Sequence, residues 1–354
     1  LRMEPSQKGY LFETDEHRAL REQIRRFAAN AIAPNAHAWE EANEFPRELY
    51  RDAAKAGFLG IGYPEELGGN GGDLTHVLVA SEEMVLAGKS VGTLVGLGSL
   101  GIAIPPILKF GSDEQKERFA RPALLGDKIS ALGITEPGGG SDVAAVRTKA
   151  VRDGDHYVVN GSKTFITSGC RADFVTTAVR TGGEGHGGIS MLVIESDTPG
   201  FSVSSKLKKT GWWASDTAEL AFEDCRVPVR NLIGQEGAGF LMIMMNFVTE
   251  RLFIAGQCVA IAELAYREAV QYAKERHAFG KNLTGFQVIR HKLADMATQI
   301  AAARSLTGEC VTRYLKGEQT PALAAMAKNA STDMCSNVCD QAVQIHGGYG
   351  YVKE

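Results

Sequence analysis

The spacing of apolar residues changes twice along this 354-residue chain, and this change constrains the fold more than any other feature of the sequence. Near the start, apolar residues recur at helical spacing, at Leu20, Ile24, Phe27, Ala28 and Ala31. A later helix is expected to begin at Ser112, which forms a capping-box pattern with Gln115, and to end before Pro122 and Gly126. Residues 1–127 are therefore predicted to be helical throughout.

Short runs of β-branched and aromatic residues follow from Lys128 onward. Asp153-Gly154 and Asn160-Gly161 separate some of these runs, and such dipeptides suit the positive φ angles of hairpin turns. The runs are residues 156–159, 164–167, 174–179, 189–194 and 218–222. They predict an antiparallel β-domain, a barrel or a sandwich, over residues 128–236.

The helical period returns after Gly237, with three long segments expected near 239–276, 286–316 and 321–346. Long helices rich in Ala bury their faces most easily against one another, so residues 237–354 are predicted to form a helical bundle. The order helices, strands, helices argues against an alternating βαβ fold. The fold class is therefore multidomain α+β, with a helical domain on each side of a central β-domain.

Charge and hydropathy restrict the class of partner. The chain has 38 basic and 42 acidic residues, a formal net charge of −4, and no long run of one sign, so a nucleic-acid partner is not expected. No uninterrupted apolar stretch of about 18 residues and no signal-type leader are found, so we expect no membrane span and a soluble intracellular protein.

The six cysteines lack short regular spacings, which favours reduced intracellular thiols over a disulfide framework. Cys335 and Cys339 stand one helical turn apart and could present two thiolates to a metal. Neither has a further Cys or His pair nearby in the sequence to complete a tetrahedral set. We therefore interpret both as packing residues of a helix and expect no metal site.

Two glycine-rich stretches have different contexts. Gly96, Gly98 and Gly101 match the dinucleotide pattern G-x-G-x-x-G, but their flanks are helical. We therefore interpret this stretch as a helix whose small residues let another helix or a ligand tail approach closely. Residues 134–142 instead follow a strand-like run and combine glycines with hydroxyl groups and backbone donors. This loop could cradle a phosphate, although a plain Pro-Gly turn is the alternative.

Five motifs together resemble the acyl-CoA dehydrogenase family in order and approximate spacing, over essentially the whole chain. They are residues 64–69, 134–142, 160–167, 276–280 and 344–350. The resemblance implies an oxidoreductase acting on CH–CH bonds, with FAD as cofactor. Its reaction would be the α,β-dehydrogenation of an acyl-CoA thioester to a trans-2-enoyl-CoA, in fatty-acid or branched-chain acyl breakdown.

The resemblance also implies which residues hold FAD. One set binds the cofactor of the same subunit, with Phe165 and Thr167 against the isoalloxazine: Leu132, Ile134, Thr135, Gly140, Ser141, Phe165, Ile166 and Thr167. A second set reaches FAD that is bound mainly by a neighbouring subunit: Arg276, Phe279, Gln287, Gln344, Ile345, Gly347 and Gly348. A homo-oligomer, typically a tetramer, would then be part of the active site.

Glu250 is the candidate catalytic base, which would take the α-proton while the β-hydride passes to flavin N5. It precedes Arg251 in an otherwise apolar run, and a lone carboxylate in such a run indicates a pocket, although a solvated Glu-Arg pair is the alternative. This arrangement resembles the isovaleryl- and long-chain subgroup. Many other members carry the base in a later segment, which implies that the C-terminal bundle is truncated here. The candidate acyl-CoA contacts are Ser141, Leu241, Val248, Thr249 and Arg251.

The family likeness suggests electron-transferring flavoprotein as the acceptor, and a bacterial cytoplasm or mitochondrial matrix as the location. Gly96, Gly98 and Ser99 would leave a deep pocket for a long or branched acyl chain. Two alternatives remain open at this stage. One is an acyl-CoA oxidase that uses O2, and the other is a non-catalytic relative that binds flavin or nucleic acid.

Overall fold

The computed structural model describes residues 9–352, and in it the chain forms two compact units. Among the described residues, unit 1 combines 9–33, 73–89 and 248–352, and unit 2 combines 34–72 and 90–247. Each unit therefore gathers segments that are separated along the chain. The three consecutive domains expected from the sequence remain a prediction.

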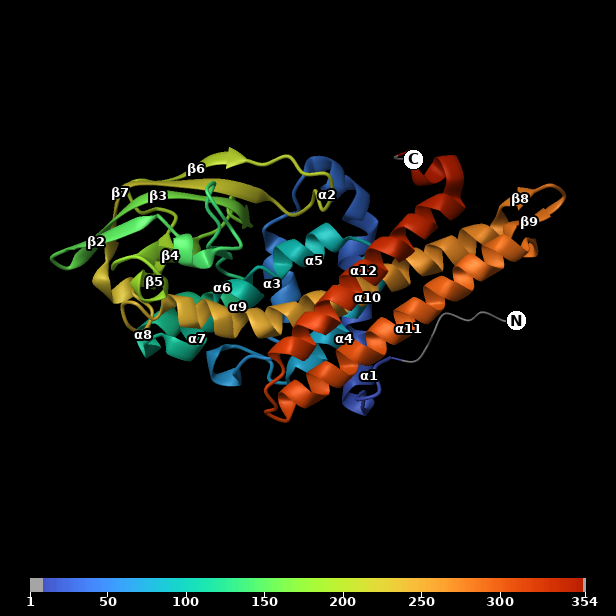
Figure 1. Cartoon of the computed structure of the whole chain (residues 1–354), viewed down its shortest axis with the longest axis horizontal. Helices are drawn as coiled ribbons and strands as arrows, with labels where there is room; N and C mark the ends of the chain where they lie inside the picture. Colours follow the sequence, from blue (N-terminus) through green and yellow to red (C-terminus); the bar gives the residue numbers. More distant parts are fainter. Residues whose placement is uncertain (1–8, 353–354) are drawn as a thin grey trace. The chain divides into compact units, whose positions relative to one another are not determined.

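Unit 1 is helical (Figure 1). Its helices are α1 (Asp15–Phe27), α4 (Leu74–Gly88), most of α10 (Gly239–Glu275), α11 (Gln287–Leu315) and α12 (Pro321–His346). The last three match the three long helices predicted from the sequence. A shared apolar core joins them, with Val259 of α10, Met296 of α11 and Val338 of α12 completely buried. Burial of such faces, rather than helix propensity, holds the bundle together.

Buried ion pairs connect α1, α4 and α11 within unit 1. The guanidinium of Arg21 contacts Glu82 at 2.7 Å and Glu83 at 2.9 Å, and Arg304 contacts Glu82 at 2.5 Å. Burial raises the cost of each charge, and the paired charges offset that cost. These pairs therefore hold α1, α4 and α11 in one arrangement.

Unit 2 contains a seven-stranded sheet with short helices around it (Figure 1). The helices are α2 (Ala36–Ala42), α3 (Glu48–Lys55), α5 (Val91–Leu97), α6 (Leu100–Ala103), α7 (Pro105–Phe110), α8 (Asp113–Gln115) and α9 (Arg121–Leu124). The strands are β1 (Ser130–Gly133), β2 (Lys149–Asp153), β3 (His156–Thr167), β4 (Phe174–Arg180), β5 (Ile189–Glu195), β6 (Phe201–Lys206) and β7 (Thr217–Pro228). The first part of α10 also belongs to this unit.

The sheet has the order β1-β4-β2-β3-β7-β6, with β5 also paired to β4. Most neighbours are antiparallel, as expected, whereas β1 and β2 each run parallel to β4. Tyr157, Val175, Leu192 and Phe222 are buried in the core of this sheet. The predicted order of helices, a β-region and helices is confirmed.

The two predicted hairpin dipeptides differ in outcome. Asp153-Gly154 does lie in the turn between β2 and β3, and Gly154 has φ +62°. Asn160-Gly161 instead lies within the continuous strand β3, so that prediction is wrong. Gly161 is at a break in register with β7, and a Cβ there would lie 2.6 Å from Thr148 Oγ1. The glycine serves close packing at a bulge rather than a turn.

The helix that begins at Ser112 does not end before Pro122. The capping box is present, since Gln115 N–H donates to Ser112 Oγ at 3.2 Å and Ser112 N–H donates to Gln115 Oε1 at 3.1 Å. A π-helical turn, Lys116–Ala120, then leads into α9, where Pro122 occupies the first turn. Proline is tolerated there because its missing N–H is not needed in a first turn.

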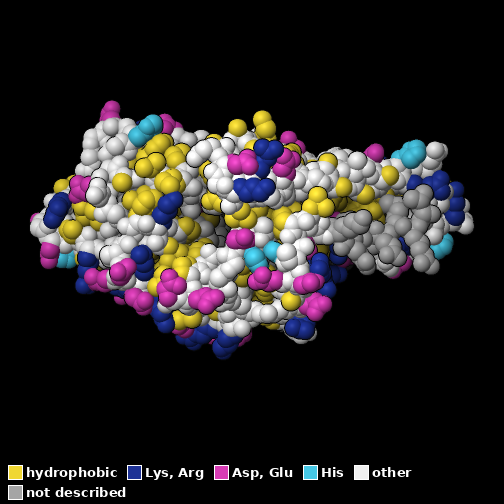
Figure 2. All heavy atoms as spheres, turned by 90° about the horizontal axis from the view of Figure 1, so that it is seen from below, with side chains coloured by type: hydrophobic (Ala, Val, Ile, Leu, Met, Phe, Trp, Pro, Cys, Tyr) yellow, Lys and Arg dark blue, Asp and Glu magenta, His cyan; other side chains and the backbone are white. Residues whose placement is uncertain are grey.

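Surface charge and two long apolar segments bear on the class of partner. On the face shown in Figure 2, acidic and basic side chains are interspersed, and no large patch of one sign gathers. Val91–Phe110 and Gly239–Glu275 are long and apolar enough to cross a membrane by length and composition alone, with 61% and 39% of their apolar windows buried. Core helices of soluble proteins meet the same criterion, so the expected absence of a membrane span remains a prediction.

The proposed acyl-chain pocket at Gly96 is not supported by its surroundings. A Cβ on Gly96 would lie 2.5 Å from Cε1 and 2.8 Å from Cζ of the buried Phe45 ring. The carbonyl oxygen of Gly96 also accepts a hydrogen bond from the Tyr50 hydroxyl at 3.1 Å. The space that glycine leaves is therefore filled by an aromatic ring of the same unit.

Substituting Gly96 is accordingly expected to destabilise unit 2 rather than to shorten a substrate pocket. Overpacking of a filled core costs about 1 to 3 kcal/mol, so Gly96→Ala should lower the free energy of unfolding by this amount, and Gly96→Leu by more. Denaturant titration measures the effect, and Phe45→Leu combined with Gly96→Ala should recover part of it. Selective loss of activity on long substrates at unchanged stability would contradict this assignment.

Candidate active site

A buried ion pair anchors the glycine-rich loop that follows β1. The Lys163 ammonium, on β3, donates to Glu136 Oε1 at 2.8 Å and to the Ile134 carbonyl at 3.0 Å. Glu136 also accepts from the N–H groups of Arg147 and Thr148, at 2.7 and 2.9 Å. Lys163 is 1% exposed and Glu136 9% exposed, so this pair fixes the start of the loop from inside the sheet. Sequence reasoning missed it.

The electrostatics of this pair favour the ionised carboxylate. Burial by itself would raise the pKa of Glu136, but the Lys163 charge and the hydrogen bonds from Thr148 hold that pKa below its ordinary value. Burial lowers the pKa of Lys163 to about 8, and Glu136 opposes that change. At neutral pH both groups remain charged, because neutral pH lies above the lowered pKa of Glu136 and below that of Lys163.

The loop beyond the anchor is open. Glu136 and Gly139 exchange two backbone hydrogen bonds of 3.1 and 3.0 Å, which closes a tight turn. A Cβ on Gly138 or Gly139 would have no atom of residues 9–352 within 4 Å, and Ser141 is exposed. A backbone without Cβ atoms lets a ligand approach closely. The loop therefore leaves room for a ligand to approach its backbone.

Phe165 is held in an unusual conformation next to this loop. It has φ +59° and lies where the register between β3 and β7 shifts, and its side chain is 67% exposed. A bulky residue in the left-handed region costs about 1 to 2 kcal/mol and is often found at functional sites. The bulge turns Phe165 outward, whereas Ile166 is buried and Thr167 is half-buried. An outward aromatic ring can stack on a planar ligand.

A separate cavity of about 540 Å³ lies at one end of unit 1. Its walls are formed by Tyr272, Arg276, Leu283, Ile345, His346, Gly347, Gly348, Tyr349 and Val352. The structure thus brings together Arg276, Ile345, Gly347 and Gly348, which the sequence analysis had grouped. Tyr272, which stacks with His346 of the 344–350 motif with ring centroids 4.5 Å apart, is a lining residue that sequence reasoning missed.

Backbone geometry shapes this cavity. Gly347 ends α12 with φ +62° and ψ −131°, a conformation open only to glycine in practice. Within the part of the chain that the structure describes, a Cβ on Gly347 or Gly348 would meet no atom within 4 Å. The hairpin of β8 (His277–Ala278) and β9 (Lys281–Asn282) follows Arg276, and its tip presents Phe279 at 95% exposure. Gln287 and Gln344 are exposed at the start of α11 and near the end of α12, outside the cavity lining.

Glu250 is half-buried on α10, among apolar residues. Burial raises the pKa of its carboxyl to about 7, and the neighbouring Arg251 charge opposes this increase only in part. Val248, Thr249 and Arg251 lie on the same helical turn, and Leu241, 62% exposed, lies earlier on α10 in unit 2. A carboxyl with this pKa can accept a proton near neutral pH.

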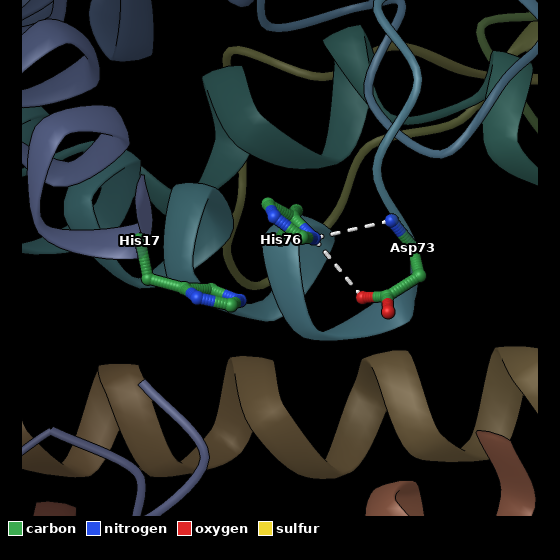
Figure 3. Close-up of side chains that lie close together, drawn as sticks. All are labelled: His17, Asp73 and His76. Carbon is green, nitrogen blue, oxygen red and sulfur yellow. Dashed lines mark hydrogen bonds and ion pairs between the residues drawn. The ribbon is translucent and has the colours of Figure 1, made fainter. Parts of the chain in front are cut away.

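His17, Asp73 and His76 form a cluster in unit 1 that the sequence analysis did not identify (Figure 3). One ligand atom from each lies within 4.8 Å of the others, a spacing that a metal could use. However, the two rings stack with centroids 4.1 Å apart and planes at 23°, so their lone pairs lie in nearly parallel planes and do not converge on one ion. The Nδ1 atoms of His17 and His76 instead accept N–H groups of Thr14 and Asp73, which caps α1 and α4.

Three family models match the chain in succession. The acyl-CoA dehydrogenase N-terminal, middle and C-terminal domains match residues 14–127, 131–225 and 237–354. The chain belongs to the acyl-CoA dehydrogenase family. The resemblance read from the five motifs is thereby confirmed.

Individual relatives agree with this assignment. A structure of a probable acyl-CoA dehydrogenase from Mycobacterium abscessus is 53% identical, with a TM-score of 0.95, over 96% of this chain and 90% of that one. The mitochondrial long-chain specific acyl-CoA dehydrogenase of Rattus norvegicus is 39% identical over 96% of this chain and 80% of its own. A glutaryl-CoA dehydrogenase from Mycobacterium smegmatis, described in complex with FADH2, is 25% identical with a TM-score of 0.90, over 97% of this chain and 87% of that one.

Family membership establishes the class of reaction. This chain is an oxidoreductase of the acyl-CoA dehydrogenase family, which acts on CH–CH bonds of acyl-CoA and uses a flavin cofactor. Because the curated relatives are named dehydrogenases, this finding supports the enzyme over the non-catalytic alternative. The roles of the individual residues above remain predictions, and two observations fit a flavin: an open glycine loop beside an outward aromatic ring, and a glycine-walled cavity carrying Arg276.

Proposed function

We propose that this enzyme catalyses FAD-dependent α,β-dehydrogenation of an acyl-CoA thioester to the trans-2-enoyl-CoA, with Glu250 as the base. The observation that carries the proposal is the half-buried carboxyl of Glu250, whose pKa is raised to about 7 by burial. A solvated carboxylate is too weak a base for the α-proton of a thioester. A desolvated one with a pKa near the working pH is better matched.

The chain's own groups would orient the substrate for this proton transfer. Val248, Thr249 and Arg251 share the helical turn of Glu250, so the rigid α10 helix fixes their positions relative to the base. The Arg251 charge favours the ionised form of Glu250 and so prevents its pKa from rising further. Ser141 and Leu241 are the further candidate contacts with acyl-CoA. The acyl chain length remains open, since the space at Gly96 is filled by Phe45.

FAD would be held by loop 134–142 and by β3 in unit 2. Backbone donors and hydroxyls of Thr135 and Ser141 suit its phosphates, Phe165 would stack on the ring system, and Thr167 would bond to its edge. Leu132, Ile134, Gly140 and Ile166 would complete this surface. When bound, the cofactor supplies the acceptor for the β-hydride.

The cavity at the end of unit 1 would receive FAD from a neighbouring subunit. Its glycine walls and the Arg276 guanidinium suit a polar anionic group, and Phe279, Gln287, Gln344 and Ile345 lie in the adjacent segments. This arrangement supports a homo-oligomer, typically a tetramer. We further propose electron-transferring flavoprotein as electron acceptor, and a bacterial cytoplasm or mitochondrial matrix as location.

Anaerobic mixing of the purified enzyme with a panel of acyl-CoA thioesters tests the proposal directly. Loss of the oxidised-flavin absorbance, together with enoyl-CoA formation, is the expected result for at least one chain length. Oxygen consumption with the same substrate separates the two enzyme classes: slow consumption supports the dehydrogenase, and rapid consumption supports an acyl-CoA oxidase. Absence of reduction with every thioester would contradict both.

Phe165→Ala should weaken flavin binding without unfolding the protein. Loss of ring stacking is worth about 1 kcal/mol, so the flavin dissociation constant should rise about five- to tenfold, as measured by fluorescence titration of the apoprotein. Phe165→Tyr, which keeps the ring, is the matched control. Phe165→Gly should match the Ala variant in flavin affinity, yet be more stable by up to about 1 kcal/mol because it relieves the positive φ. Unchanged affinity in Phe165→Ala would remove Phe165 from the flavin site.

A further inference from the structure

A second cavity of unit 1, about 830 Å³ in volume, shares no lining residue with the cavity around Arg276. Its walls come from the segment before α1, from α1 itself, and from α4, α10 and α11. Among the described residues, the arginines that line it are Arg18, Arg21, Arg25, Arg267 and Arg304. The proposed dehydrogenation uses none of these side chains, so the cavity needs an explanation of its own.

The carboxylates in the walls are already engaged by arginines. They are Glu13, Glu82 and Glu83. Arg21 contacts all three, at 2.5, 2.7 and 2.9 Å in that order. Arg25 contacts the second oxygen of Glu83 at 3.0 Å, and Arg304 contacts the second oxygen of Glu82 at 2.5 Å. Because each carboxylate oxygen has an arginine nitrogen beside it, the walls are poor in acceptors for further donors.

Arg304 has more donors than this network uses. Its side chain is 9% exposed, and its Nη2 atom is the one that contacts Glu82. Within residues 9–352, the buried Nε and Nη1 atoms of Arg304 have no hydrogen-bond partner. The Tyr10 ring lies 5.1 Å from Cζ and offsets part of the charge, but it supplies no acceptor oxygen to these atoms. Buried donors without an acceptor are rare and costly, so they indicate that an acceptor comes from a ligand.

Arg18, Arg25 and Arg267 present further donors where the cavity opens to solvent. Their side chains are 60%, 55% and 37% exposed, so a ligand can reach them from solution. Each donates to one carboxylate, through Nε and, in Arg18 and Arg25, also through Nη2. The Nη1 atom of each guanidinium takes no part in these bonds. The cavity therefore combines a buried arginine with three accessible ones.

We propose that this cavity binds a small oxyanion that carries phosphate or carboxylate groups. Such a ligand supplies the acceptor oxygens that the walls lack, and guanidinium groups bind these oxygens through strong charge-assisted hydrogen bonds. A purely structural network of ion pairs accounts for Arg21, whose three nitrogens all donate to carboxylates, but not for Arg304. The inference goes beyond the proposed dehydrogenation and does not depend on it, because its test measures binding rather than turnover.

Isothermal titration calorimetry of the intact holoenzyme with inorganic phosphate, pyrophosphate and citrate, at constant ionic strength, tests the proposal. At least one of these probes should bind once per subunit with a Kd of about 1 mM or lower. Comparison of the phosphates with citrate then distinguishes the two classes of oxyanion. The same probe should raise the Tm, since a ligand that binds only the folded state stabilises it. A saturating acyl-CoA should leave the Kd of the probe unchanged.

Two variants locate the binding. Arg304→Lys keeps a positive charge beside Glu82 but removes the guanidinium donors, so the Kd should rise about tenfold. Arg313→Gln, which alters an exposed arginine of α11 outside the cavity, is the matched control and should leave the Kd unchanged.

Three outcomes would overturn the proposal. They are no binding of any probe, equal affinity in Arg304→Lys and the unmodified enzyme, and displacement of the probe by acyl-CoA, which would assign the ion to the substrate site. Far-UV circular dichroism shows whether Arg304→Lys is folded. If it is not, Arg267→Lys takes its place and should weaken binding several-fold by the same loss of guanidinium donors.

Discussion

Glu250→Gln is expected to lower kcat by about 10²- to 10⁴-fold, because it removes the group proposed to take the α-proton while keeping the shape of the side chain. Anaerobic stopped-flow reduction of the bound flavin by an acyl-CoA measures this step directly. Flavin content and substrate affinity should stay close to those of the unmodified enzyme. Glu250→Asp keeps the carboxyl but shortens the side chain. Its kcat should lie between that of the unmodified enzyme and that of Glu250→Gln.

The pH profile gives a second signature of Glu250. Because its pKa is raised to about 7, the fraction of ionised base increases as pH rises toward 7 and then levels off, and kcat/KM should follow the same curve. The variant should lose this ionisation. If Glu250→Gln reduces flavin as fast as the unmodified enzyme, another residue is the base, although the dehydrogenase assignment would stand.

Ionisation of Glu250 should raise the activity of the enzyme but lower the stability of its fold. The carboxyl has a pKa of about 7 in the folded state and about 4.3 when unfolded, so between these values the folded state holds more protons. The free energy of unfolding therefore falls as pH rises through this window. Glu250→Gln should stabilise the protein at pH 8 by roughly 1 to 3 kcal/mol, as denaturant titration at pH 5 and pH 8 would show.

Long periodic segments were predictable because their signals are local. The three C-terminal helices repeat an apolar face over many turns and end at Gly or Pro, so their limits agree with the structure within one or two residues. Strand β1 has only four residues and was recognised only as a strand-like run before the 134–142 loop, and β6 alternates weakly and was not identified as a strand. Short strands depend on their neighbours in the sheet more than on their own sequence.

The two errors at Asn160-Gly161 and Pro122 have non-local causes. Both patterns usually mark a turn or a helix end, and here the glycine is needed because Thr148 comes close from a separate segment. Pro122 is accommodated because the π-helical turn before it resets the hydrogen-bond pattern. The cause at Gly96 is also non-local, because the ring of Phe45, a residue distant in the sequence, fills the space that glycine leaves.

The candidate site was accessible from the sequence only in part. Motif resemblance grouped Arg276 with the 344–348 segment, and the structure does place Arg276, Ile345, Gly347 and Gly348 around one cavity. It gave no indication that Lys163 would pair with Glu136. An inward-facing lysine in a strand was the available signal, because a buried charge requires a partner.

Apart from substitutions at Glu250, Lys163→Met is the single substitution expected to lower stability and flavin content most. It removes the ammonium that pairs with Glu136 at 2.8 Å and leaves a carboxylate, 9% exposed, without its counter-charge. Breaking a buried pair in this way costs about 3 to 5 kcal/mol. Because Lys163 also holds the Ile134 carbonyl at 3.0 Å, the 134–142 loop should loosen and the purified protein should lose most of its flavin.

A double substitution separates the charge effect from the loss of anchoring. Lys163→Met with Glu136→Gln leaves no unpaired charge and keeps a side-chain oxygen that can accept from the Thr148 N–H and hydroxyl, now 2.9 and 2.6 Å from Glu136. It should therefore recover much of the lost stability, since neutral replacement of a buried ion pair is often tolerated. Flavin content should recover less, because the bond from Lys163 to Ile134 is still missing. If Lys163→Met alone keeps both full stability and full flavin content, the ion pair does not anchor the loop.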